Sequence, residues 1–218
     1  YRYDASGNVL SVTDTIDGLL GATTTYTYDS LNRITAITQA GDNVADKRVN
    51  FTYTELGLFS SINRYSDLAG TSLLVSTNYT YDSLARLTDL RHNNGTSDIA
   101  FYEFVYDASS RITSLSDVDG NTSYSYDDIG QLISADHTNA DNPDESYVYD
   151  NNGNRVSSTI HGDEYLTAPG NRILSDGVYN YDFDNEGNML RRTNIATGDL
   201  RDYEWDHRNR LTAVIDKD

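Results

Sequence analysis

Pairs of aromatic residues separated by one residue recur along the chain, each followed by a polar turn and an aliphatic stretch. The segment "TTTYTYD" is followed by "SLNRITAITQ", and "NYTYD" is followed by "SLARLTDL". Side chains alternate between the two faces of a β-strand, so both rings of a pair belong on one face. Threonine and aromatic residues dominate these runs and suit a pleated surface. Each repeat therefore predicts a strand, a tight turn and a second strand.

The second aromatic residue of each pair sets the register of the repeat, and we use it as the anchor position. Nine of the ten anchors are aromatic, and nine of the ten residues two positions earlier, such as Tyr26, are aromatic as well. Ten matched registers indicate a true internal repeat with a period of roughly 17 to 28 residues. The anchors are Tyr3, Tyr28, Tyr53, Tyr81, Tyr106, Tyr126, Tyr149, Leu166, Phe183 and Trp205.

An aspartate follows the anchor in eight repeats, where its carboxylate suits the first position of a turn. These residues are Asp4, Asp29, Asp82, Asp107, Asp127, Asp150, Asp184 and Asp206, with Thr54 and Thr167 as exceptions. Four residues after the anchor the chain has mostly Gly or Asn, which tolerate positive φ at the end of a turn. This set is Gly7, Asn32, Gly57, Ala85, Ser110, Gly130, Gly153, Gly170, Gly187 and Asn209.

The next residue is often Arg or Asn, and we expect it to bond back across the turn or to pair with the nearby Asp. The arginines at this position are Arg33, Arg86, Arg111 and Arg210, and the asparagines are Asn8, Asn154, Asn171 and Asn188.

The pattern predicts an all-β fold of consecutive antiparallel hairpins that form a curved or spiralling sheet. Stretches with a 3.6-residue apolar period and caps at both ends are missing. We expect about ten hairpins and 18 to 20 strands in a single region over residues 1–218. Because the chain opens inside a repeat, we also expect it to be a fragment of a longer protein.

These residues carry a resemblance to a known family. The segments "YTYDSLNRITAIT", "YTYDSLARLTDL", "FVYDASSRITSL" and "WDHRNRLTAV" resemble the tyrosine-aspartate (YD) repeats of the Rhs family, over essentially the whole chain. The resemblance implies part of a β-shell or barrel, as in the cocoons of Rhs and insecticidal toxin complexes and in teneurin barrels. The self-cleaving terminal region of Rhs toxins has no counterpart in this sequence.

Composition narrows the range of partners. The formal net charge is −18, from 16 basic and 34 acidic residues, which argues against nucleic acid and anionic membrane surfaces. No cysteine is present, so disulfides and thiolate chemistry are excluded, and no apolar run is long enough for membrane insertion as a helix. Eighteen tyrosines favour broad, half-buried surfaces over a thick aliphatic core.

The repeated aspartates raise the question of chemistry, because paired carboxylates serve glycoside hydrolysis. A residue that recurs at one turn position in eight repeats is better explained as a determinant of the fold. Four histidines lie in different repeats, are expected mostly in loops and lack metal-binding spacing: His92, His137, His161 and His207. We therefore predict no enzyme activity, no catalytic residue and no cofactor.

Two segments are candidates for calcium, although each has a structural explanation. "DFDNEG" supplies Asp182, Asp184 and Glu186, but position 12 of the corresponding loop is Thr193, and flanking helices are missing. "DVDGN" supplies Asp117 and Asp119, but Asp-Gly between alternating segments indicates a hairpin. The sequence favours no metal at either place.

Two functions remain open from the sequence. The first is a structural shell segment of a large secreted or cell-surface protein, which encloses or displays another polypeptide, such as a toxin, and contacts neighbouring repeats. The second is a cell-surface adhesion or glycan-binding module, since rows of tyrosine suit sugar rings. Cross-strand aromatic packing explains the same rows, and we favour the first function.

Overall fold

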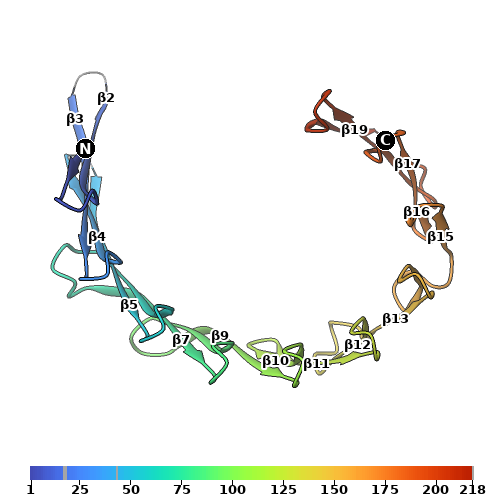
Figure 1. The fold of residues 1–218 in the computed structure, drawn as a ribbon, viewed down its shortest axis with the longest axis horizontal. Coiled ribbons are helices and arrows are strands. Elements are labelled where there is room, and N and C mark those ends of the chain that lie inside the picture. Colours follow the sequence, from blue (N-terminus) through green and yellow to red (C-terminus); the bar gives the residue numbers. More distant parts are fainter. Residues whose placement is uncertain (17–18, 43, 218) are drawn as a thin grey trace. The chain divides into compact units, whose positions relative to one another are not determined.

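The computed structural model describes residues 1–16, 19–42 and 44–217, and its regular elements are all β-strands (Figure 1). A 14-stranded sheet contains β1 (Arg2–Tyr3), β2 (Val9–Ile16), β3 (Leu19–Tyr28), β4 (Ile34–Gly41), β5 (Val44–Tyr53), β6 (Phe59–Tyr65), β7 (Leu73–Tyr81), β8 (Leu87–Asn93), β9 (Asp98–Tyr106), β10 (Ile112–Asp117), β11 (Gly120–Tyr126), β12 (Leu132–His137), β13 (Glu145–Tyr149) and β14 (Arg155–Ser158). A six-stranded sheet contains β15 (Tyr165–Ala168), β16 (Arg172–Asp176), β17 (Tyr179–Phe183), β18 (Met189–Asn194), β19 (Leu200–Trp205) and β20 (Leu211–Lys217).

Strand order follows chain order in both sheets, and consecutive strands pair antiparallel. The predicted all-β fold of consecutive hairpins is therefore confirmed. Contacts group the chain into two units, Tyr1–Asn121 and Thr122–Asp218, with the boundary inside β11. The single region expected from the sequence stays a prediction.

The hairpins share one register irregularity, which lies at the anchor residue. In β3 and β4, Thr27 pairs with Ala36 while the next residue, Tyr28, pairs with Ile34. The shift recurs at the anchors of the hairpins β5–β6, β7–β8, β11–β12, β17–β18 and β19–β20. A three-residue turn that ends in a left-handed residue produces such a bulge and increases the local twist.

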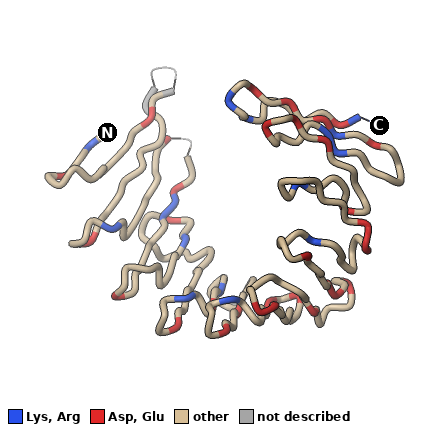
Figure 2. Tube along the Cα trace, turned by 45° about the vertical axis from the view of Figure 1, so that its right-hand side comes forward, with Lys and Arg blue, Asp and Glu red and all other residues tan. Residues whose placement is uncertain are grey.

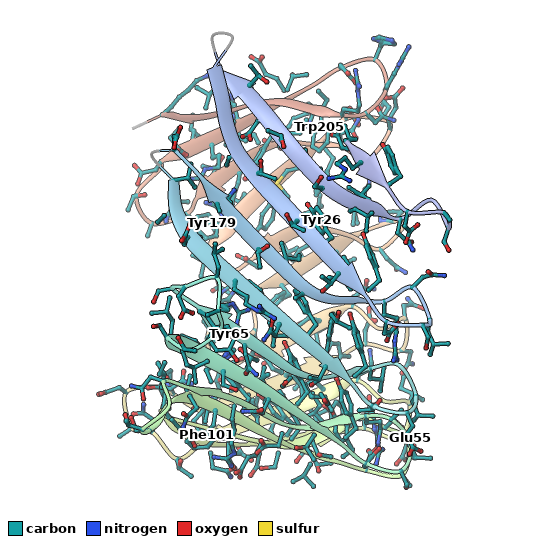
Figure 3. The ribbon with its side chains drawn as sticks, turned by 90° about the vertical axis from the view of Figure 1, so that its left-hand side faces the viewer. Tyr26, Glu55, Tyr65, Phe101, Tyr179 and Trp205 are labelled. Carbon is teal, nitrogen blue, oxygen red and sulfur yellow. The ribbon has the colours of Figure 1, made fainter. Side chains whose placement is uncertain are left out.

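The strands of each unit form one layer with almost no buried apolar core. In residues 1–121 the buried hydrophobic side chains among those described are Ala22 and Ala36, and in residues 122–218 there is only Ala135. The aromatic face is half-buried: Tyr26 (labelled in Figure 3) and Tyr28 are both partly covered, whereas Thr27 between them is exposed. The stability of this fold must therefore come largely from contacts between neighbouring strands.

Within the described ranges the chain contains no helix, and hence no helix that could cross a membrane.

Candidate functional site

The feature that repeats most faithfully is the turn that follows each aromatic pair. After β3, the Oδ1 atom of Asp29 accepts hydrogen bonds from the backbone N–H groups of Leu31 (2.9 Å) and Arg33 (3.0 Å). Its Oδ2 atom accepts a bond from Nε of Arg33 at 2.7 Å. The backbone N–H of Asp29 donates to the carbonyl of Arg33, and that of Asn32 donates to the carbonyl of Asp29. One carboxylate therefore closes the loop with both oxygens.

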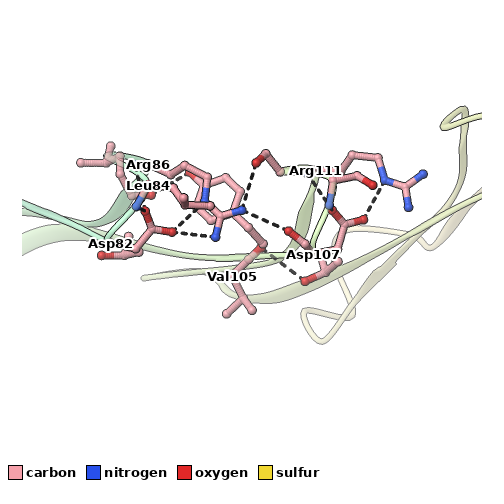
Figure 4. Close-up of polar contacts among 12 residues, drawn as sticks. Asp82, Leu84, Arg86, Val105, Asp107 and Arg111 are labelled. Atoms are coloured by element: carbon pink, nitrogen blue, oxygen red, sulfur yellow. Dashed lines mark hydrogen bonds and ion pairs between the residues drawn. The ribbon is translucent and has the colours of Figure 1, made fainter.

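The same geometry recurs with arginine or asparagine as the closing residue, by which we mean the residue four positions after the turn aspartate. At Asp127 the closing residue is Gln131, whose backbone N–H donates to Oδ1 of Asp127 at 2.8 Å. Figure 4 shows Arg86 bound to Asp82 and Arg111 bound to Asp107. Arg210 closes the turn at Asp206, and asparagine closes the turns at Asp4, Asp150 and Asp184. In the turn that begins with Thr54 instead of aspartate, the hydroxyl of Thr54 accepts the backbone N–H of Leu58 at 3.2 Å, so the turn is kept with fewer bonds.

The third loop residue takes a left-handed conformation in every repeat. The φ angles at the ten positions set by the anchors all lie between 56° and 91°. Glycine adopts this conformation without strain, while Ala85 (61°) and Ser110 (64°) adopt it at an energetic cost.

Hydrogen bonds in the turns lower the pKa of Asp4, Asp29, Asp82, Asp107, Asp150, Asp184 and Asp206. At Asp29 and Asp107 the largest cause is the hydrogen bond from the backbone N–H of the closing residue, and the side chain of that residue also lowers the pKa. At Asp4, Asp150, Asp184 and Asp206 the side chain of the closing residue comes first. At Asp82 desolvation is the largest single cause and acts in the opposite direction, yet the bonds from Arg86 and Leu84 outweigh it and the pKa is lowered. Such carboxylates are fully occupied, which makes them poor general acids or nucleophiles.

Closing residues also connect one turn to the next. Nη1 of Arg86 donates to the carbonyl of Asp107 and to the hydroxyl of Ser110, both at 3.1 Å, and the guanidinium lies 4.6 Å from the ring centre of Tyr106. Asparagine makes the corresponding link from Asn8 to Asn32, from Asn154 to Asn171 and from Asn188 to Asn209. A row of side chains therefore ties successive turns along one edge of the sheet in each unit.

The anchors make a second connection between hairpins. The hydroxyl of Tyr28 donates to the carbonyl of Val9 at 2.8 Å, and that of Tyr53 donates to the carbonyl of Ile34 at 2.7 Å. Tyr81, Tyr106 and Tyr149 repeat this bond, and Nε1 of Trp205 does the same to Met189. Each acceptor lies at or just before the start of the second strand of the preceding hairpin. These bonds explain why the anchor prefers an aromatic residue with a polar tip.

The least regular repeat lies where the strand ladder is interrupted between β14 and β15. Its anchor, Leu166, is 61% exposed, and Ser158 joins the two strands through a 3.0 Å hydrogen bond between its hydroxyl and that of Tyr165. Nearby, the buried carboxylate of Asp176 accepts the backbone N–H of Tyr179 (2.7 Å) and the hydroxyl of Tyr181 (2.7 Å).

The same cluster shifts two pKa values. Desolvation is the largest influence on Asp176 and would raise its pKa, but the bonds from Tyr179, Tyr181 and Val178 together lower it. Burial, followed by the bond to that carboxylate, raises the pKa of Tyr181. The hydroxyl of Ser158 is buried and already bonded, so the Ser158, His161 and Asp176 side chains do not form an accessible catalytic triad.

The calcium candidates do not come together in the described part of the chain. Both carboxylate oxygens of Asp184 accept hydrogen bonds within its own turn. Asp182 pairs in register with Arg191 on the neighbouring strand. Asp117 accepts the N–H of Asp119 in the turn that follows β10. Among the described residues, no three His, Asp or Glu side chains gather closely enough to hold a metal ion.

The expected placement of the histidines in loops is wrong for two of the four. His92 lies in β8, where its Nδ1 atom hydrogen-bonds to the hydroxyl of the buried Thr77 (3.0 Å). His137 ends β12 and makes the equivalent bond to Thr122 (2.9 Å). A threonine directly opposite on the neighbouring strand supplies the partner that makes a strand position favourable for histidine.

Comparison with known proteins agrees with this geometry. The family described as the Teneurin YD-shell matches residues 11–218. The whole chain aligns with 13% of a chain in the Photorhabdus luminescens Tc holotoxin pore, with 18% sequence identity and a TM-score of 0.62. The crystal structure of TcdB2-TccC3-TEV aligns over 99% of this chain and 15% of that chain, with 17% identity and a TM-score of 0.45. No curated protein matches the sequence.

Proposed function

Because the chain belongs to the Teneurin YD-shell family, we propose that it is a wall segment that encloses or displays another polypeptide of a secreted or cell-surface protein. The observation that carries the proposal is that the repeated side chains form hydrogen bonds within and between hairpins. Turn aspartates, closing residues and six of the ten anchors bond to their own hairpin or to the adjacent one. These side chains therefore serve the construction of a surface.

The single-layer architecture supports the same function. A sheet with almost no core of its own presents a half-buried aromatic face that other protein can cover, as the wall of a container requires. The structural neighbour with the same fold forms part of a toxin complex, and the chain spans only 13% of that neighbour's length. On this proposal the chain performs no catalysis, and the enclosed component carries the activity.

A glycan-binding role has less support. Guanidinium groups cover several of the tyrosine rings that sugars would need: Arg33 lies 4.5 Å from the ring centre of Tyr53, and Arg155 lies 4.1 Å from that of Tyr147. These contacts favour the structural explanation of the tyrosine rows.

Electron microscopy of the protein that carries this chain tests the proposal. We expect a closed wall of β-hairpins around density that the wall does not account for, and protection of that enclosed segment from protease added outside. An extended sheet without an interior, or rapid cleavage of the remaining polypeptide while the sheet stays intact, would contradict it.

A further inference from the structure

A hollow on the last four strands differs in charge from the rest of this acidic chain. It has a volume of about 370 Å³ and is lined by Tyr179, Arg192, Asn194, Asp199, Arg201, Asp216 and Lys217, together with Leu200. All of these residues belong to the unit formed by residues 122–218. Figure 2 shows the basic positions of these strands interspersed with acidic ones. Three basic side chains and two carboxylates line it, whereas acidic residues outnumber basic ones in the chain as a whole.

One of the basic side chains in the lining has no ion-pair partner. Arg192 and Arg201 face each other in register on β18 and β19, and like charges in such a position repel. Asp216 compensates Arg201 with a two-pronged ion pair, and Lys217 is bound by Asp202. Among the described residues, no carboxylate lies within ion-pair distance of Arg192. Its positive charge acts on Asp216 only at longer range, where it helps to lower the pKa of that carboxyl after the larger effect of Arg201.

Arg192 is held in place although it has no ionic partner. Its guanidinium lies 4.3 Å from the ring centre of Tyr179, which is labelled in Figure 3. Stacking on an aromatic ring restrains the planar group while leaving its N–H edge able to donate. The group is therefore already ordered for a ligand that accepts two parallel hydrogen bonds.

Further donors point to the same kind of ligand. The side-chain oxygen of Asn194 accepts the backbone N–H groups of Ala196 and Thr197, which leaves its amide nitrogen as a donor. Within the described ranges, neither that nitrogen nor the hydroxyl of Tyr179 has a hydrogen-bond partner. A guanidinium, an amide and a phenol thus line one hollow with unused donors, and they call for an acceptor that carries negative charge.

We propose that this hollow binds a carboxylate, with Arg192 as the principal ligand and Asn194 and Tyr179 as additional donors. A planar carboxylate matches the fork of a guanidinium. One guanidinium without an ion-pair partner fits a monoanion, whereas Asp199 and Asp216 would repel the dianionic form of phosphate. The volume lies near the lower end for small-molecule sites, which limits the bound group to about one sugar acid or one acidic side chain.

The inference does not rest on the proposed shell function, because it is argued from the side chains that line the hollow. It is tested by titrating the full chain with sodium glucuronate and with N-acetyl-glutamate amide, followed by calorimetry and by NMR of the backbone amides of β18 and β19. Methyl glucoside and N-acetyl-glutamine amide serve as neutral ligands of matching size, and inorganic phosphate serves as the dianion. We expect both carboxylates to bind at least about tenfold more tightly than their neutral counterparts and than phosphate. Whichever carboxylate binds more tightly identifies the source, a sugar acid or a polypeptide side chain.

Adjacent arginines provide a matched pair of variants. Arg192→Gln removes the proposed ligand and also relieves the repulsion with Arg201, so the variant is expected to fold. Arg191→Gln removes the same charge one residue earlier, where the side chain pairs with Asp202 instead of lining the hollow. We expect binding to weaken about tenfold or more in Arg192→Gln and to stay within about twofold of the parent in Arg191→Gln.

Several results would overturn the assignment. They are equal binding of charged and neutral ligands, binding of phosphate as tight as that of the carboxylates, and equal losses in the two arginine variants. Melting curves of both variants show whether each is folded under the titration conditions. If Arg192→Gln is unfolded, Asn194→Ala replaces it, and an unchanged affinity in that variant also contradicts the proposal.

Discussion

The carboxylate of Asp29 organises its turn through three hydrogen bonds, two of them to backbone N–H groups. Replacing Asp29 with Ala removes all three, and we expect the melting temperature of the chain to fall by a few degrees. Ser30→Ala is the control, because this neighbouring side chain is exposed and does not hold the turn. Differential scanning calorimetry on both variants provides the measurement. Equal melting of the two variants would mean that the aspartate is dispensable for the turn.

The lowered pKa values of turn aspartates such as Asp29, Asp107 and Asp150 predict an acid-sensitive fold. Because each folded-state pKa lies below its unfolded value, the charged carboxylate stabilises the folded state. That stabilisation is fully present above the unfolded value and is lost as the pH falls through the folded one. We therefore expect the melting temperature to decline steeply below about pH 4, although protonation also relieves the repulsion within a chain of net charge −18.

A variant separates the two effects of acid. Asp82→Asn keeps an oxygen that can accept the N–H groups of Leu84 and Arg86 but removes the titrating charge. We expect this chain to melt below the parent at pH 7 and to lose less stability between pH 5 and pH 2.5. If parent and variant decline in parallel, titration of this turn does not contribute to the acid response.

The anchor hydroxyl can be tested within a single strand. Tyr28 donates to Val9 in the preceding hairpin, whereas Tyr26, on the same face, has no hydroxyl partner among the described residues. Tyr28→Phe should destabilise the chain by about 0.5–1.5 kcal/mol, since it leaves a carbonyl without its donor. Tyr26→Phe should have little effect. Urea denaturation measures both, and a larger loss in Tyr26→Phe would contradict the role assigned to the anchor.

At the scale of the hairpin, the left-handed turn residue limits stability in two repeats. Ala85 and Ser110 have φ angles of 61° and 64° at positions where other repeats have glycine. Ala85→Gly should stabilise its hairpin by about 0.5–1 kcal/mol, because relief of backbone strain exceeds the added entropy of the unfolded chain. Ala108→Gly, at a turn position without positive φ, should be neutral or destabilising. The midpoints of urea denaturation of the parent and of both variants measure these changes in stability. A loss of stability in Ala85→Gly would contradict the strain argument.

The hairpins could be predicted because each is encoded locally. The aromatic alternation specifies the strand, and the turn aspartate specifies where the loop begins. The residue before Arg33 or Arg86 ends the loop and produces the bulge, so all the signals lie within about a dozen residues. Even Thr54, which lacks the carboxylate, keeps the turn through its hydroxyl. Bonds between hairpins could not be predicted, because the carbonyl that accepts the Tyr53 hydroxyl belongs to a residue 19 positions earlier and has no side-chain signature.

The interruption between β14 and β15 shows where local patterns stop being informative. Leu166 occupies an anchor position but carries no polar tip, so the bond to the preceding hairpin is lost. Another contact joins this repeat to the preceding hairpin, the hydrogen bond from the side-chain amide of Asn154 to Asn171, 17 residues further along the chain. The Asp-Gly pair at Asp176 and Gly177 indicates a turn, yet it does not reveal that an added Cβ at Gly177 would lie 2.5 Å from the carbonyl oxygen of His161. Packing of that kind becomes visible only in three dimensions.

For the whole molecule, the single-layer construction implies that each hairpin is stabilised mainly by the hairpins next to it. Adjacent hairpins contact each other through the strand ladder, turn-to-turn links or anchor bonds, and the described residues of each unit form almost no shared core. Proteins built in this way behave approximately as one-dimensional arrays, whose stability is a sum of repeat and interface contributions. A substitution that destabilises one hairpin should therefore destabilise only the hairpins close to it in the sheet.

Hydrogen exchange can measure that distance. In a chain carrying Asp29→Ala, we expect amide protection to fall most in β3 and β4, to fall less in β2 and β5, and to stay at parental levels in β17–β20. Asp206→Ala should give the reverse pattern, because its turn connects β19 and β20. Mass spectrometry of peptic fragments under native conditions resolves both patterns. A uniform loss of protection across the described strands in either variant would show global two-state unfolding and refute the array description. A graded loss centred on the altered turn would mean that the wall can open at one hairpin while distant ones stay closed.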